Sequence, residues 1–201
     1  MISTSGRFAI IGWGSLIWDM DGLERHVTGD WAMSAGPALP LEFSRVSAKR
    51  LGGLAVCIDP EHGVDCPSHV IASRRGCLLR AAVDLARRER APIRRIGIAW
   101  PQHGVLRSHV PGIGERFAAW CEASGWDGAV WTDLDRNFEA EKREPFGIPA
   151  AERHLAGLTG ASRVEAVRYI EEAPRATDTP LRRHLAAQPW WQAAVREVLG
   201  R

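Results

Sequence analysis

The nine residues Phe8-Ala9-Ile10-Ile11-Gly12-Trp13-Gly14-Ser15-Leu16 join a short apolar run to a turn with glycine on both sides of Trp13. An apolar run that stops at glycines is typical of a buried strand that meets a turn. Such a turn presents backbone amide hydrogens in the arrangement that binds carboxylates or oxyanions. A tight glycine turn without a ligand is at least as common, and the spacing matches neither a dinucleotide fingerprint nor a phosphate loop.

The length and composition of the chain predict one globular domain. The 201 residues suffice to bury a core, and 45% hydrophobic with 25% charged residues is ordinary for a folded protein. We therefore expect a single domain over residues 1–201, with 150–201 as a helical C-terminal extension. We expect it to be a monomer or a homodimer.

Several classes of partner are disfavoured. The apolar stretch 8–18 is too short to cross a bilayer and lacks a signal-peptide cleavage site, so we expect a cytoplasmic protein without a membrane partner. The net charge of +2 comes from basic residues scattered among acidic ones, so no nucleic-acid partner is expected. Neither a metal nor a disulfide framework is expected, because no ligand spacing connects Cys57, Cys66, Cys77 and Cys121.

The hydrophobic periodicity predicts an α+β fold. Alternating apolar residues predict antiparallel strands at 41–47 and 54–59, in a meander that continues at 69–74. From Gly76 the spacing becomes helical, and Pro92 marks the end of this helix. Its predicted core face consists of Leu78, Leu79, Ala82, Val83, Leu85 and Ala86. The remaining elements of this region are strands at 93–100 and 129–134 and a helix at 113–123. The mixed order favours a small mixed, mostly antiparallel sheet or barrel that is flanked by helices.

The last third of the chain is predicted to be helical. Val164, Val167 and Ile170 share one helical face, and Pro180 and Pro189 stand where helices are expected to begin. We expect these additional C-terminal helices to pack over the sheet.

The charged segment 137–148 is predicted to be a loop or lid, because it ends in proline and glycine. Its carboxylates Glu139, Glu141 and Glu144 form a rival acid/base set. Consecutive charges in a loop are usually solvated, so Glu141 is kept only as a reserve candidate.

Glu89 is the charged residue that helical geometry singles out. At about 100° per residue it lies on the face of Leu85, whereas Arg87, Arg88 and Arg90 are expected to point elsewhere. A carboxylate that faces the core near a helix end is partly desolvated, which suits it to proton transfer. Glu89 is therefore a candidate general base. The open alternative is that it pairs with an arginine or caps a buried polar group.

Three segments resemble a known enzyme family. Ile11-Gly12-Trp13-Gly14-Ser15-Leu16-Ile17-Trp18 resembles the Tyr-Gly-Ser-Leu loop after the first strand of γ-glutamylcyclotransferases and ChaC-type glutathione-degrading enzymes. Phe43-Ser44-Arg45-Val46-Ser47 resembles the second strand of bacterial members. Leu85-Ala86-Arg87-Arg88-Glu89 is similar to the family's Leu-Asp-x-x-Glu segment, whose glutamate is the acid/base. Trp13 stands in place of the family's tyrosine and Ala86 in place of its aspartate.

The resemblance implies a γ-glutamylcyclotransferase-like fold and a reaction without a cofactor. In that reaction the α-amine of a small γ-glutamyl substrate attacks its own γ-carbonyl and releases 5-oxoproline and an amine. The resemblance assigns the proton transfer to Glu89 and the binding of the carboxylate and oxyanion to loop amides. The substrate-binding residues it implies are Gly12, Trp13, Gly14, Ser15 and Leu16.

Two other classes of function stay open. A non-catalytic small-molecule-binding protein on the same scaffold is favoured if Trp13 fills the site or an arginine holds Glu89. A protein-interaction module would use the tryptophan-rich C-terminal helices, above all Trp190 and Trp191.

Overall fold

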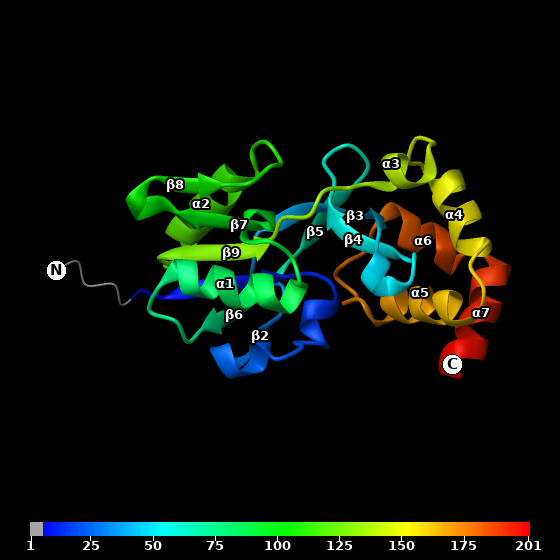
Figure 1. Ribbon diagram of the computed structural model, residues 1–201, viewed down its shortest axis with the longest axis horizontal. Coiled ribbons are helices and arrows are strands. Elements are labelled where there is room, and N and C mark those ends of the chain that lie inside the picture. The colour runs from blue at the N-terminus through cyan, green and yellow to red at the C-terminus, as the bar shows by residue number, and fades with distance from the viewer. Residues whose placement is uncertain (1–5) are drawn as a thin grey trace. The chain divides into compact units, whose positions relative to one another are not determined.

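The computed structural model describes residues 6–201, which form nine β-strands and seven α-helices (Figure 1). The predicted α+β class is confirmed. The contacts divide the chain into two compact units, residues up to 38 with 67–134, and residues 39–66 with 135–201. The second unit therefore contains the predicted extension 150–201 and two further segments.

A six-stranded mixed sheet forms the centre of the first unit. Its order is β2-β6-β1-β9-β7-β8, and every neighbouring pair is antiparallel except β1 with β9. The predicted mixed, mostly antiparallel sheet is confirmed, and within the described residues it does not close into a barrel. The strands are β1 (Phe8–Gly12), β2 (Val27–Ala32), β6 (His69–Ser73), β7 (Ile96–Trp100), β8 (Val105–Arg107) and β9 (Gly128–Thr132).

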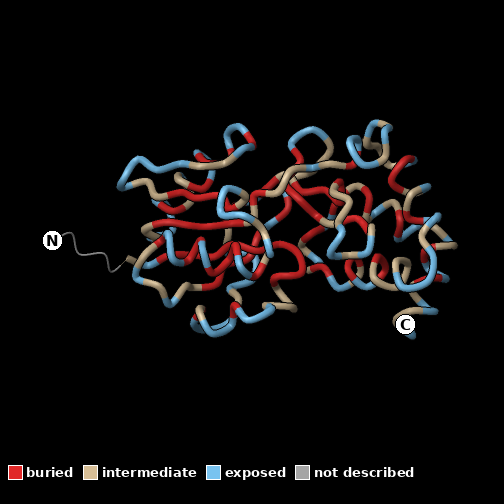
Figure 2. The backbone as a smooth tube through the Cα atoms, viewed as in Figure 1, coloured by how far each residue is buried: buried red, intermediate tan, exposed pale blue. Residues whose placement is uncertain are grey.

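Two helices cover this sheet, α1 (Leu78–Glu89) and α2 (Ile113–Ser124). Val130 of β9 belongs to the apolar core beneath α1, whereas the next residue, Trp131, stacks on Phe117 of α2 with 3.7 Å between ring centroids. Successive side chains of a strand point to opposite faces, so the two helices lie on opposite sides of the sheet. Figure 2 shows the resulting buried stretches along the strands of this unit.

Gly97 of β7 makes room for the buried ring of Trp131. The two residues are paired in the ladder between β7 and β9. A Cβ on Gly97 would lie 2.0 Å from the indole of Trp131, so no larger residue fits without displacing the ring.

The second unit contains a three-stranded sheet of order β4-β3-β5. The predicted pairing of 41–47 with 54–59 is confirmed, because β3 and β4 are antiparallel. The predicted continuation of this meander at 69–74 is wrong, because β6 pairs with β1 and β2 in the six-stranded sheet instead. The strands are β3 (Ala38–Val46), β4 (Leu54–Ile58) and β5 (Val64–Pro67).

Five helices complete the second unit, and α5 packs against β4. The predicted starts at Pro180 and Pro189 are confirmed, and the Thr179 hydroxyl caps α6 by accepting a hydrogen bond from the Arg182 backbone. The predicted loop 137–148 is wrong in part, because it contains α3. The helices are α3 (Phe138–Lys142), α4 (Ile148–Ala156), α5 (Gly160–Glu172), α6 (Pro180–Ala186) and α7 (Pro189–Leu199).

Trp190 and Trp191 at the start of α7 hold this helix within the second unit. The Trp190 indole donates to Glu152 of α4 and the Trp191 indole donates to Glu171 of α5, each over 2.8 Å. Across the described part of the chain, no helix combines the length and apolar character that crossing a membrane requires.

Candidate functional site

The glycine-flanked loop follows β1 as a single turn of 3-10 helix over Ser15–Ile17. The Ile17 amide donates to Gly14 and the Asp19 amide donates to Ser15, which closes the turn. Within residues 6–201 we find no acceptor for the amide hydrogens of Gly14, Ser15 and Leu16. The loop therefore keeps the backbone donors that the sequence predicts for it.

Glu89 ends α1 at the same end of the sheet as this loop. Ile11 pairs with Trp131, so the parallel strands β1 and β9 end side by side at Gly12 and Thr132. The Thr132 hydroxyl donates to Oε1 of Glu89 over 3.2 Å. The Glu89 side chain is only 12% exposed, and no described residue binds its second oxygen, Oε2.

Arg88 connects Glu89 with the loop. Its Nη1 donates to Oε1 of Glu89 over 2.7 Å, and its Nη2 donates to the Ser15 hydroxyl over 3.3 Å. Nε and Nη2 also donate to the backbone oxygen of Asp19. One guanidinium thus links a loop after β1 to a carboxylate at the end of α1.

The prediction that Arg88 points away from the core is wrong, because its side chain is only 3% exposed. The buried stripe of α1 runs through Ala81, Leu85 and Arg88, spaced four and three residues apart. Leu79 and Val83, which the sequence placed on the core face, are 56% and 38% exposed. The helix also ends before Pro92, because Arg90 adopts a left-handed conformation with φ of 52°.

Two buried nitrogens beside the loop have no hydrogen-bond partner among the described residues. They are Nε2 of His69 and Nε1 of Trp31. His69 lies opposite Gly12 in the ladder between β1 and β6, and the Trp31 ring is 3.0 Å from where a Cβ on Gly12 would lie. Both side chains therefore lie next to the start of the loop. Sequence reasoning missed them, because neither belongs to a recognisable motif.

The hydrogen bonding of His69 makes Nε2 a donor. Its Nδ1 accepts a hydrogen bond from the Ser34 amide over 2.8 Å, so the proton of the neutral ring is on Nε2. Burial lowers the pKa of His69, which keeps the ring neutral near pH 7. His69 and Trp31 thus add two side-chain N–H groups to the backbone donors of the loop.

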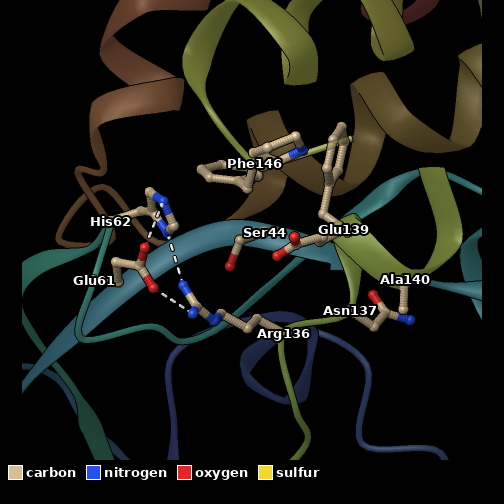
Figure 3. Close-up of a pocket in the computed structure, with 10 residues that line it drawn as sticks. Ser44, Glu61, His62, Arg136, Asn137, Glu139, Ala140 and Phe146 are labelled. Atoms are coloured by element: carbon tan, nitrogen blue, oxygen red, sulfur yellow. Dashed lines mark hydrogen bonds and ion pairs between the residues drawn. The ribbon is translucent and has the colours of Figure 1, made fainter. Parts of the chain in front are cut away.

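The second unit contains a pocket of about 350 Å³. Glu139, which the sequence placed in the rival acid/base set, lines this pocket, whereas Glu141 does not. Figure 3 shows its labelled side chains, which come from β3, the turn after β4 and the segment around α3. The lining residues are Ser44, Glu61, His62, Arg136, Asn137, Phe138, Glu139, Ala140, Pro145 and Phe146.

The fully buried carboxylate of Asp59 lies at the centre of the polar network of this pocket. It accepts from Nη1 of Arg136 over 3.3 Å and contacts Nδ1 of His62 at 3.2 Å. Burial acts to raise the pKa of Asp59. Hydrogen bonds from Ser44 and the His62 backbone, with the nearby charges of His62 and Arg136, outweigh burial and lower it. Asp59 is therefore an anion at neutral pH.

No protein-family model, no curated protein and no solved structure matches this chain. Within residues 6–201, no three His, Cys, Asp or Glu side chains gather in a way that could hold a metal ion. The chemistry of the two sites must therefore be inferred from their own residues.

Proposed function

We propose that the loop Gly12–Leu16 and Glu89 form the site of a γ-glutamylcyclotransferase-type enzyme. Its substrate is a γ-glutamyl amine or peptide, and its product is 5-oxoproline. The observation that carries this proposal is the bridge made by Arg88, which joins Ser15 of the loop and Glu89 in one hydrogen-bonded network. The reaction needs no cofactor.

In the proposed reaction Glu89 relays two protons in turn from the attacking nitrogen. Its Oε1 is held by Arg88 and Thr132, which leaves Oε2 for the substrate. Oε2 takes a proton from the substrate's α-ammonium, and the freed amine attacks the γ-carbonyl carbon. Glu89 gives this proton to the leaving nitrogen as its C–N bond breaks. It then takes the second proton from the attacking nitrogen, which becomes the lactam N–H, and releases that proton to the departing amine.

The donors of the site match the oxygens of this substrate. The amides of Gly14, Ser15 and Leu16 stabilise the oxyanion that develops on the γ-carbonyl oxygen. The N–H groups of His69 and Trp31 supply donors for a further oxygen of the ligand. A γ-glutamyl substrate offers oxygen acceptors to these N–H donors and an ammonium to the Glu89 carboxylate. It therefore matches both the donors and the base of the site.

A second candidate, a non-catalytic small-molecule-binding protein, is favoured by the arginine pair of Glu89. From the sequence, a non-catalytic binding protein is favoured if an arginine holds Glu89 or if Trp13 fills the site. Arg88 does bind Glu89, and Trp13 is 5% exposed. The two candidates use the same donors and differ only in whether Oε2 of Glu89 accepts a proton during turnover.

Release of 5-oxoproline separates the two candidates. The full chain is incubated with a panel of γ-glutamyl amino acids, γ-glutamyl amines and glutathione, and 5-oxoproline is quantified. Binding of the same compounds is measured in parallel by isothermal titration calorimetry. Turnover on any member supports the enzyme, and saturable binding without turnover supports the binding protein. The absence of both turnover and binding would contradict both candidates.

A further inference from the structure

The pocket of the second unit has a net negative character. Glu61 and Glu139 line it, and the buried anion Asp59 lies against its polar side. Arg136 is the only guanidinium among the lining residues. Its Nη2 donates to Glu61 and its Nη1 donates to Asp59, so these two carboxylates already neutralise it.

Glu139 is the carboxylate of this pocket that remains available. No described residue forms a hydrogen bond or an ion pair with its side chain, although it lines the cavity. Figure 3 shows its carboxylate pointing toward the side of the pocket where Ser44 lies. The Ser44 hydroxyl itself is fully buried and lies 3.4 Å from Sγ of Cys57, so it already has a hydrogen-bond partner within the unit.

Aromatic rings form the apolar wall of the same pocket. Phe138 and Phe146 meet edge to face with 5.4 Å between ring centroids, and His62 packs on Phe146 at 4.9 Å. The faces of aromatic rings attract cations, and their bodies bind apolar groups. The free carboxylate of Glu139 and the aromatic wall together define a site for a cation that also has an apolar part.

We propose that this pocket binds a small organic cation, a primary ammonium that carries a short apolar group. The ammonium donates to the Glu139 carboxylate, and the apolar group packs on Phe146, whose ring Phe138 supports edge to face. A volume of about 350 Å³ lies at the small end of the range for small-molecule sites and has room for an amine of a few carbons. An anion is disfavoured, because Arg136 is already paired.

This inference does not rest on the proposed function, because all residues of the pocket belong to the second unit. Its test is an NMR titration of the full ¹⁵N-labelled chain with n-butylamine, which is an ammonium at pH 7. Butyrate and 1-butanol serve as anionic and neutral probes of the same shape. We expect saturable shifts of the Glu139, Ala140 and Phe146 amide signals with the amine alone.

Two glutamates of α3 provide a matched pair of variants. Glu139→Gln removes the unpaired carboxylate of the pocket. We expect it to weaken binding of the amine about tenfold or more, because a charge-assisted contact is lost. Glu141→Gln makes the same change on the same helix outside the lining, and we expect unchanged affinity. Phe146→Ala should weaken binding severalfold through the lost ring contact. No saturable shift with the amine, equal binding of butyrate or butanol, or full affinity in Glu139→Gln would overturn the proposal.

Discussion

Nη1 of Arg88 lies 2.7 Å from Oε1 of Glu89, the next residue along α1. Neighbouring residues of a helix project about 100° apart, so two long side chains must converge to form this pair. The guanidinium also binds Ser15 and the backbone of Asp19. The pair thus fixes the end of α1 to the loop, in addition to orienting the proposed base.

Removal of Arg88 should destabilise the first unit. Arg88→Met leaves the nearly buried carboxylate of Glu89 without its cation, and we expect a loss of about 3 kcal/mol in the free energy of unfolding. The double variant Arg88→Met with Glu89→Gln should recover part of this loss, because it also removes the unpaired charge. Urea unfolding of the four proteins measures the coupling. If the losses in free energy of unfolding of the two single variants simply add in the double variant, Arg88 and Glu89 do not interact, which would contradict the prediction.

His69 should make the fold less stable in mild acid. Burial lowers the pKa of His69 below its ordinary value of about 6.5, so the unfolded chain takes up a proton at a higher pH than the folded chain. The contribution of the neutral ring is complete above about pH 6.5 and is lost as the pH falls below it, towards the folded-state pKa.

The variant His69→Asn isolates this effect. Asparagine keeps an acceptor near the position of Nδ1 for the Ser34 amide but does not titrate. We expect its stability, measured by urea unfolding, to fall less than that of the wild type between about pH 6.5 and pH 5. His154, whose pKa burial also lowers, keeps its contribution in both proteins. Identical dependence of stability on pH in the two proteins would show that His69 has the same pKa in the folded and the unfolded chain, which would contradict the prediction.

Gly97→Ala should be among the more damaging single-methyl changes in the first unit. The added Cβ would lie 2.0 Å from the Trp131 indole, which stacks on Phe117 and cannot move without disturbing α2. We expect a loss of about 3 kcal/mol, at the upper end for overpacking. Gly104→Ala, where nothing lies within 4 Å but φ is 63°, should cost about 1 kcal/mol through backbone strain. Thermal unfolding compares the two variants. An equal loss of stability in both would show that the contact between position 97 and Trp131 is not the cause.

The sequence predicts well the elements whose signal is local. The strand before Gly12 and the helix predicted at 113–123 appear close to their predicted bounds, because a continuous apolar run or a helical stripe marks each. The strands that were missed, β2, β5 and β8, all lie at sheet edges. Two exposed residues of β8, Val105 and Leu106, show why, since an edge strand without a buried face has no alternation to detect.

The site could be predicted only in part. The helical stripe drew attention to the end of α1. Four residues of its predicted face, Leu78, Ala82, Leu85 and Ala86, are buried, but Leu79 and Val83 are exposed. Arg88 is also buried, and Glu89 lies at the edge of that face. His69 and the pocket side chains come together through pairing of distant segments, which no local pattern specifies.

The most direct test of the proposed function compares 5-oxoproline release by the wild type, Glu89→Gln and Glu122→Gln. Glu122 is exposed on α2, so its variant controls for the loss of one negative charge. We expect turnover in the wild type and in Glu122→Gln, and a fall of about 100-fold or more in Glu89→Gln with an unchanged circular dichroism spectrum. Turnover that persists in Glu89→Gln would contradict the role of Glu89 as the base.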